Sequence, residues 1–288
     1  MKSRLPLVLS IALLAVAVLV GAGAPAPARA AQSPAAVARH ILGHKPHGLA
    51  AVVVRRGIVR VALDSNYAPQ SSIDPATRKL VGFDVDVADT VAGILGLKVR
   101  FKCPAWETIP ASLTAHKYYD VSIGSMDITR ARRSIVDFAH PYRYTAAQVV
   151  VKKGGVKIQG VSGLFGKRVG VEKSSVYSQF LKRYPQIKAK TYKTAVDALY
   201  GLLHGKLKFV LMGQEDARQA IRGAGKPLQF SGRPLFHARL AFAVGQGQSD
   251  WLTLLNYTVR KMHRDGSLSA MSKKWYGGRD LTVRHWGR

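Results

Sequence analysis

The feature that most constrains the fold of this chain is a regular alternation of short apolar runs with longer amphipathic segments. Apolar runs of strand length occupy residues 58–63, 97–101 and 120–126. Between the first two, the apolar residues of segment 83–95 recur at intervals of four, four, three and one, which is one face of a helix, and Gly96 ends the pattern. Strands that alternate with helices pair in parallel and are covered by those helices. The alternation therefore predicts an α/β fold.

The same alternation returns in the second half of the chain. Further strands are predicted at residues 168–171, 209–212 and 240–244. Helices are predicted at residues 106–115, 177–184, 194–204, 216–224, 251–264 and 268–275. Two successive runs of alternation predict two α/β lobes. Ligands of such folds bind at the carboxyl ends of the strands and between lobes.

Residues 1–30 have the pattern of a secretory signal peptide. Lys2 and Arg4 precede an apolar stretch at residues 5–20, and an Ala-x-Ala cleavage motif follows at residues 28–30. No cysteine follows the apolar stretch, so a lipid anchor is not expected. Cleavage near Ala30/Ala31 would place the mature protein in the periplasm or outside the cell, and an uncleaved N-terminal anchor is the alternative.

Residues 31–51 follow as an N-terminal leader that we expect to be poorly ordered. The leader contains His40, His44 and His47, whose spacing suits metal ligands on a helix. A glycine and a proline between these histidines interrupt any such helix. No metal site and no cofactor are therefore expected.

The chain is a strongly basic protein, with 44 Lys and Arg against 16 Asp and Glu and a formal net charge of +28. Removal of residues 1–30 takes away three positive charges and no negative one, which leaves +25. Such a charge attracts polyanions without specificity, but the basic residues are spread along the whole sequence and no nucleic-acid-reading motif is present. A nucleic-acid partner is therefore not expected. The single cysteine, Cys103, excludes an intrachain disulfide and is expected to be a partly buried thiol.

Four segments carry a resemblance to a known family. They are VRRGIVRV at residues 54–61, LVGFDVDVA at residues 80–88, the stretch 118–138 with YYD, DITRARR and VDF in it, and the stretch 265–277 with DGSL and KKWYG. In this order and spacing the chain resembles the bacterial extracellular solute-binding proteins of family 3, the polar amino-acid receptors of ABC importers. The resemblance covers residues 52–278.

The resemblance implies a two-lobed periplasmic-binding-protein fold, known as the Venus flytrap, with two α/β lobes joined by a two-strand hinge. Lobe 1 would be discontinuous, made of residues 52–148 and 241–288, and lobe 2 would be residues 149–240 with the hinge strands at its ends. The ligand would lie between the lobes, and their closure would be read by an ABC permease in the inner membrane. A monomer is expected.

The resemblance also implies a set of ligand-binding residues in the first lobe. Arg132 matches the arginine that clamps the α-carboxylate of an amino acid, because a guanidinium fork fits a carboxylate; a surface arginine is the alternative. Ser125 and Asp127 fall where the family presents oxygens to the α-ammonium. Asp127 stands where Thr or Ser is usual, and a helix N-cap is the alternative role. Tyr67 and Trp106 match the aromatic walls around the ligand side chain.

Two further parts of the site are implied. Asp64 ends the first strand and would face the same cleft. A helix start in the second lobe would present backbone N–H groups to the ligand carboxylate. The residues of this helix start are Ser174, Ser175 and Val176.

The sequence departs from the family pattern in the second lobe. Gly213 stands where the family carries an aspartate for the ligand ammonium, and Lys208 stands where a strand often begins with Asp. We expect Asp127 to supply the missing carboxylate from the other lobe. Glu215 and Asp216 are less favoured substitutes because they are expected at a helix N-terminus.

These features favour an extracytoplasmic solute-binding protein that captures a small polar ligand, an amino acid first of all, for an ABC importer, and not an enzyme. The sequence contains no G-x-S-x-G, no H-E-x-x-H and no cysteine–histidine pairing, so no catalytic residue is assigned. The alternatives are an exported enzyme similar to cyclohexadienyl or arogenate dehydratases, with Glu107, Asp127 and Arg132 as its acid and anion clamp, and a sensor without a transport role.

Overall fold

The computed structural model describes residues 32–115, 118–222 and 227–283. The signal peptide expected at residues 1–30 lies outside them. Within the described residues, no helix is both long enough and apolar enough to cross a membrane.

One eight-stranded sheet runs through the described chain, in the order β5-β1-β6-β11-β7-β10-β8-β9. Its strands are β1 (Ile58–Ala62), β5 (Lys98–Lys102), β6 (Val121–Asp127), β7 (Val136–Lys152), β8 (Arg168–Glu172), β9 (Lys188–Tyr192), β10 (Phe209–Gly213) and β11 (Leu228–Gly245). The outer strands pair in parallel, β5 with β1 and β1 with β6 at one end, β10 with β8 and β8 with β9 at the other. The predicted parallel α/β pattern is thus confirmed at both ends of the sheet. A separate small sheet contains β2 (Asn66–Tyr67), β3 (Ser71–Ile73) and β4 (Leu80–Val81).

The two strands in the middle of the sheet are long and antiparallel. β7 has 17 residues and β11 has 18. One half of their shared ladder joins residues 136–147 to residues 236–245, and the other joins residues 149–152 to residues 228–231. β11 pairs with β6 on one side, and β7 pairs with β10 on the other. The last strand is therefore much longer than the five residues that the sequence predicted, because it pairs with β7 along both halves of their ladder.

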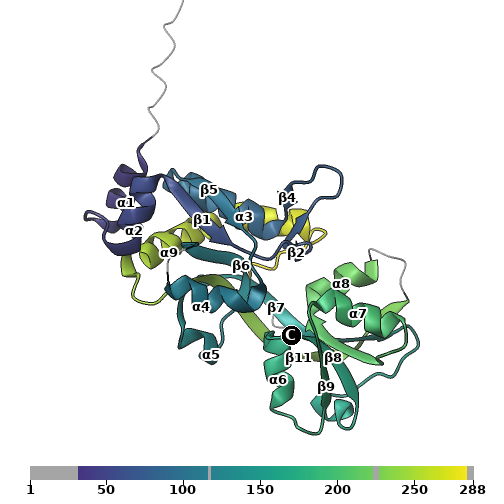
Figure 1. Cartoon of the computed structure of the whole chain (residues 1–288). Helices are drawn as coiled ribbons and strands as arrows, with labels where there is room; N and C mark the ends of the chain where they lie inside the picture. Colours follow the sequence, from purple (N-terminus) through teal and green to yellow (C-terminus); the bar gives the residue numbers. More distant parts are fainter. Residues whose placement is uncertain (1–31, 116–117, 223–226, 284–288) are drawn as a thin grey trace, which may run out of the picture. The chain divides into compact units, whose positions relative to one another are not determined.

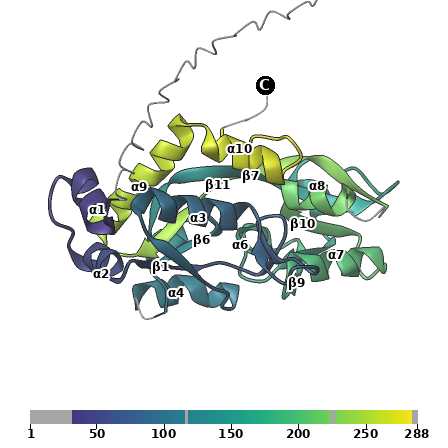
Figure 2. The same cartoon turned by 90° about the horizontal axis from the view of Figure 1, so that it is seen from above.

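Helices cover the sheet (Figures 1 and 2). The helices are α1 (Pro34–Leu42), α2 (Gly48–Arg56), α3 (Phe83–Leu95), α4 (Ile109–Thr114), α5 (Arg130–Arg133), α6 (Val176–Lys182), α7 (Ala195–Leu203), α8 (Gln214–Arg222), α9 (Ser249–Arg264) and α10 (Ser267–Trp275). Buried apolar residues between positions 38 and 142 and between positions 240 and 281 form two clusters, which together we call the first core. Those between positions 147 and 236 form two more clusters, which together we call the second core. We call the parts built on these cores the first lobe and the second lobe.

The N-terminal leader is ordered, contrary to the expectation from its composition. α1 begins after Ser33, whose side chain accepts the Ala36 N–H, and ends at Gly43 with a φ of 78°. Ala50 and Val53 of α2 are fully buried in the first core. In Figure 1 the purple α1 and α2 lie beside the yellow-green α9, in agreement with their contacts. The leader is therefore part of the first lobe.

The single cysteine also differs from its prediction. Cys103 directly follows β5 and is exposed, because the strand ends one residue earlier and the chain turns into a loop.

Candidate functional site

Seven of the nine residues that the sequence nominated line one pocket. They are Asp64, Tyr67, Trp106, Ser125, Asp127, Arg132 and Ser175, and Glu172 and Tyr177 complete the lining. Asp64 follows β1, Trp106 follows β5 and Asp127 ends β6. These are the carboxyl ends of parallel strands, where open α/β sheets place their ligands. Because Glu172, Ser175 and Tyr177 come from the second lobe, the pocket lies between the lobes.

Two nominated residues are not among those that line this pocket. Ser174 is exposed and adopts a φ of 59°, and Val176 is half-buried in the first turn of α6. Ser175 is the N-cap of α6: its Oγ accepts the Ser178 N–H at 3.1 Å and donates to the Glu172 carbonyl at 2.7 Å. The Ser175 hydroxyl therefore organises the turn between β8 and α6.

Arg132 is buried although it stands in a run of arginines. Only 6% of Arg132 is exposed, whereas Arg130 and Arg133 are exposed. Its Nη1 donates to the Asp127 backbone carbonyl at 3.1 Å and lies 3.5 Å from Asp127 Oδ2. Its guanidinium carbon lies 5.6 Å from the ring centroid of Trp106. These contacts exclude a surface arginine and fix the guanidinium inside the pocket.

Asp127 is not the cap of the following helix. Thr129 caps α5, since its Oγ1 accepts the Arg132 N–H at 3.1 Å. Asp127 is 9% exposed, and its Oδ1 is buried without a hydrogen-bond partner. Burial raises the pKa of Asp127, against the lowering effect of Arg132 and Arg143. The carboxylate thus has one acceptor atom to offer to a donor in the pocket.

Ser125 sits at a special backbone position near the end of β6. Its φ is 52°, its N–H donates to the Tyr142 hydroxyl at 2.8 Å, and its Oγ donates to Asp84 Oδ1 at 3.1 Å. Asp84 is fully buried, and burial raises its pKa to about 6 although Arg143, Tyr142 and Ser125 oppose the shift. The Ser125 hydroxyl is therefore already engaged by Asp84.

The glycine before Ser125 allows β6 to approach the end of β1 closely. A Cβ at Gly124 would lie 3.2 Å from the Leu63 Cα, which is tighter than an ordinary contact, and 3.6 Å from the Trp106 ring, which is an ordinary contact. A side chain at position 124 would therefore press on the backbone at Leu63.

Glu172 is a site residue that the sequence analysis missed. It is the last residue of β8 and lines the pocket. Burial raises its pKa to about 8, and Asp64, Asp216 and Asp127 add to the shift while Arg132 opposes it. The signal in the sequence was its place at the carboxyl end of a predicted parallel strand, the same argument that selected Asp64.

Asp216 occupies the space that Gly213 leaves. A Cβ at Gly213 would collide with Asp216 Oδ2 and would lie 2.9 Å from the Tyr177 hydroxyl. Asp216 Oδ2 accepts the Tyr67 hydroxyl at 3.0 Å, and its Oδ1 accepts Gln70 Nε2. Asp216 lies in the first turn of α8, as expected from the sequence, and this turn aims its carboxylate back over Gly213.

Glu215, the neighbour of Asp216, has other partners. Its Oε1 lies 3.0 Å from Arg279 Nη2 and 3.4 Å from Arg218 Nε. Burial raises the pKa of Glu215, and Arg279 and Arg218 oppose the shift. Glu215 therefore holds the second lobe to the C-terminal segment.

A second, larger chamber adjoins the pocket. It has a volume of about 280 Å³ and shares Asp64, Tyr67 and Glu172 with the pocket. Asp216 also lines it. Its apolar lining comes from Ala195, Val196, Leu199, Tyr200, Met212, Ala220 and Leu228. The pocket is small and polar. The chamber is larger, and its lining combines apolar side chains with carboxylates.

Arg143 is a further residue that the sequence analysis did not single out. It stands on β7, is 1% exposed, and its guanidinium carbon lies 5.3 Å from the ring centroid of Tyr276. Burial lowers its pKa, but Tyr276, Tyr67 and several carboxylates outweigh burial, so the pKa lies above its ordinary value. Arg143 is thus a permanent buried positive charge that partly balances Asp84, Asp127 and Asp216.

Among the described residues, one group of possible metal donors lies outside the pocket. It contains His44, His47 and Asp250, and none of the three lines the pocket. Glu107, which the enzyme alternative required, is exposed and is not among the pocket residues.

The family of this chain follows from a comparison with known protein families. The family described as bacterial extracellular solute-binding proteins, family 3, matches residues 59–278. The chain belongs to this family. Membership in family 3 confirms the resemblance read from the four motifs and an extracytoplasmic role.

Individual relatives of this family 3 protein are similar over most of their length. The chain is 31% identical to the L-cystine-binding protein TcyJ of Escherichia coli (strain K12) over 237 residues, 82% of this chain and 88% of TcyJ. It is 26% identical to the ABC transporter arginine-binding protein 1 of the same organism over 223 residues, 76% of this chain and 90% of that protein. The structure of an ancestral arginine-binding protein bound to arginine matches with a TM-score of 0.72 and 32% identity, covering 77% of this chain and 99% of that one.

These matches confirm two expectations for the family 3 protein. The fold is the periplasmic-binding-protein fold. The relatives are named as binding proteins, which confirms a solute-binding protein rather than an enzyme.

Proposed function

We propose that this protein captures an amino acid with a positively charged side chain and delivers it to an ABC importer. The observation that carries the charge preference is the concentration of acidic groups at the site. Asp64, Asp127, Glu172 and Asp216 line the pocket and its chamber, in a chain that has only 16 acidic residues against 44 basic ones. The names of relatives, which include an arginine-binding and a cystine-binding protein, support an amino acid.

The small pocket would hold the amino-acid head group. Arg132 would receive the α-carboxylate on its guanidinium fork, with Trp106 stacked against the same guanidinium. The α-ammonium would donate to the unpaired Asp127 Oδ1 and to the Ser125 carbonyl. A buried ammonium needs such acceptors because leaving it unpaired is strongly unfavourable.

The chamber would hold the side chain. Its apolar wall suits a methylene chain, and Asp64, Glu172 and Asp216 suit a cation. Without a cation these carboxylates repel one another, which is part of the reason why the pKa of Glu172 rises to about 8. A cationic side chain would relieve the repulsion, and a neutral one would not.

The arrangement in two lobes suits a transport cycle of opening and closing. We place the lobe boundary at residues 148/149 and 240/241, within β7 and β11. A ligand that contacts both lobes favours their closed arrangement, and an ABC permease in the inner membrane would bind that arrangement. Processing near Ala30/Ala31 would release a periplasmic monomer.

The experiment is a calorimetric comparison of ligands that differ in one group each. Arginine, lysine and ornithine are expected to bind at least ten-fold more tightly than glutamine, cystine or leucine. Agmatine, which keeps the cation of arginine but lacks its carboxylate, tests the role of Arg132 and should bind weakly. Glutamate or leucine binding as well as arginine would contradict the charge preference. Conversion of prephenate would contradict a binding role.

A further inference from the structure

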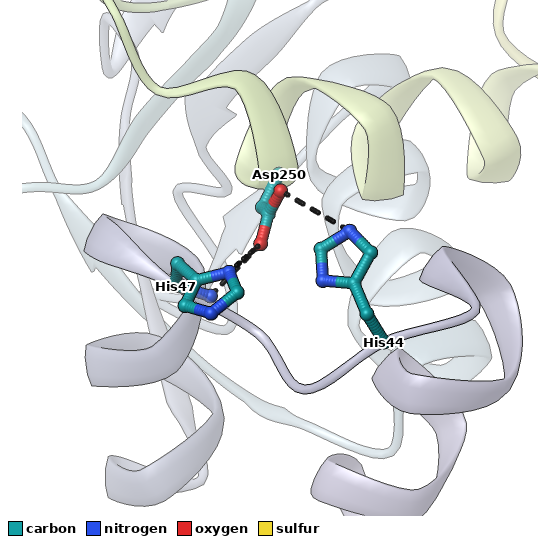
Figure 3. Close-up of side chains that lie close together, drawn as sticks. All are labelled: His44, His47 and Asp250. Atoms are coloured by element: carbon teal, nitrogen blue, oxygen red, sulfur yellow. Dashed lines mark hydrogen bonds and ion pairs between the residues drawn. The ribbon is translucent and has the colours of Figure 1, made fainter.

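Three donor side chains meet outside the amino-acid site. His44 and His47 stand in the short connection between α1 and α2, and Asp250 lies in the first turn of α9 (Figure 3). One ligand atom from each residue lies within 4.8 Å of the other two. We propose that His44, His47 and Asp250 bind one divalent metal ion of the zinc type, with water in the remaining position.

Two of the three separations between the donors are close to those of a zinc-bound site, and the third is no longer than 4.8 Å. His44 Nε2 lies 3.8 Å from Asp250 Oδ1, and His47 Nδ1 lies 3.5 Å from Asp250 Oδ2. Zinc binds imidazole nitrogen and carboxylate oxygen at about 2.0–2.2 Å, so tetrahedral ligand atoms stand about 3.3–3.6 Å apart. The side chains of His44 and His47 are 50% and 74% exposed, so their rings can turn inward without disturbing packed atoms.

The ring of His44 is already oriented by its other nitrogen. His44 Nδ1 lies 3.0 Å from the Lys45 carbonyl oxygen, which can only accept a hydrogen bond. Nδ1 of the neutral ring therefore carries the proton, and Nε2 presents its lone pair toward Asp250 (Figure 3). A metal-binding histidine regularly donates its second ring N–H to a carbonyl in this way.

Asp250 is held in place by the start of α2. Its Oδ2 accepts the His47 backbone N–H at 2.8 Å, and only 16% of its side chain is exposed. The neighbouring Gln248 Oε1 accepts the Leu49 N–H at 3.0 Å. These hydrogen bonds to backbone N–H groups explain how α2 begins, but they do not involve the imidazole rings. The positions of both rings near one fixed carboxylate therefore point to a shared ion.

The donor set selects the class of metal. Two imidazole nitrogens with one carboxylate suit zinc, cobalt, nickel or copper, whereas magnesium and calcium prefer oxygen donors throughout. In the sequence, the glycine and proline between the histidines argued against a metal site. In the structure, the same break in the helix brings the three donors together. Gly43, with a φ of 78°, ends α1 so that His44 and His47 both reach α9, where Asp250 lies 203 residues after His47. A bound ion would clamp the N-terminal helices to the first lobe.

The test is calorimetric titration of Zn²⁺ into the untagged, chelator-treated protein at about 0.15 M ionic strength, where distant charges are screened. One ion per chain is expected, with a higher melting temperature that a chelator reverses. His44→Ala and His47→Ala should each lower the affinity at least ten-fold. Asp250→Asn should do the same, although Asn keeps an acceptor for the His47 N–H. Cobalt should give the absorption of a tetrahedral site.

Matched variants separate this site from adventitious binding. His40→Ala and His263→Ala remove exposed histidines of α1 and α9, and Cys103→Ser removes the exposed thiol. All three should leave the zinc affinity unchanged. The proposal is overturned if no stoichiometric binding occurs, if the control variants lose as much affinity as the site variants, or if Asp250→Asn binds as the unmodified protein does.

Discussion

Moving one carboxylate between positions 216 and 213 tests which group of the second lobe receives the ligand's positive charge. Asp216→Ala removes a carboxylate that lines the chamber and accepts hydrogen bonds from Tyr67 and Gln70. Loss of one partner of a buried charge pair costs about 2–5 kcal/mol. Asp64 and Glu172 remain in the chamber, so we expect the lower end, about 2 kcal/mol or roughly a 30-fold weaker affinity for arginine.

The compensating change is Gly213→Asp. In the native chain its Cβ would collide with the Asp216 carboxylate, so Gly213→Asp alone should also weaken binding. In the double variant Gly213→Asp/Asp216→Ala the Asp216 carboxylate is gone, and the Tyr177 hydroxyl, 2.9 Å from the new Cβ, has to shift slightly. Gly213 is not among the residues with a positive φ, so its backbone accepts a side chain. The double variant should regain at least ten-fold of the lost affinity.

The assay is calorimetry with arginine, accompanied by apo melting curves. Tyr67→Phe is the matched control, because it removes the hydrogen bond to Asp216 and keeps the carboxylate. If Tyr67→Phe reproduces the whole loss, the bond between the lobes and not the charge explains the effect. A double variant no better than Asp216→Ala, or an Asp216→Ala variant with native affinity, would refute the reasoning.

Other changes give distinct outcomes. Arg132→Ala should abolish arginine binding, with a loss of about 2–5 kcal/mol in calorimetry and a folded apo protein by circular dichroism; unaltered affinity would remove Arg132 from the site. Asp127→Ala should weaken arginine binding without the loss of a helix cap, because Thr129 holds the cap; a drop in apo melting temperature with native affinity would contradict this. The pKa of Glu172 in the folded protein, about 8, lies above the ordinary value of 4.5, so between these two pH values the native state binds a proton that the unfolded chain has lost. The free energy of unfolding of the apo protein should therefore fall as the pH rises from about 4.5 to about 8, arginine affinity should rise over the upper part of that range, and Glu172→Gln should flatten both in melting curves and calorimetry. Mass spectrometry of the exported protein should find a chain that begins near Ala31, and a retained Met1 would contradict cleavage.

Much of the fold followed from the sequence because its helices and inner strands are amphipathic or apolar. α3 and β6 were predicted within a residue or two, since their buried positions recur at the helical and strand periods. β9 was missed because its residues are exposed except for a half-buried Tyr192, so no alternation marks it. β7 was missed because Pro141 and several polar residues interrupt its pattern where the ladder with β11 shifts register.

The site was predictable to the extent that it follows strand ends. Asp64 ends a predicted strand, whereas Trp106, Asp127 and Arg132 were implied by the family resemblance, and all four line the pocket. Asp216 was not, because the direction in which a first-turn side chain points depends on the space beside Gly213, and that space is visible only in three dimensions. His44 and His47 likewise gain their common partner from a helix far along the chain.

The long central strands also dictate an order of folding. The second core draws on residues 147–236, a continuous stretch, so its contacts can form while the rest of the chain is still unfolded. β6, at residues 121–127, pairs with β1 but has its other neighbour at residues 240–243, and α2 packs against α9. Contacts between such distant segments form slowly because a long loop has to close first. The first lobe should therefore be the last part to become resistant to proteases, and a chain cut before residue 240 should retain a protected fragment from its middle.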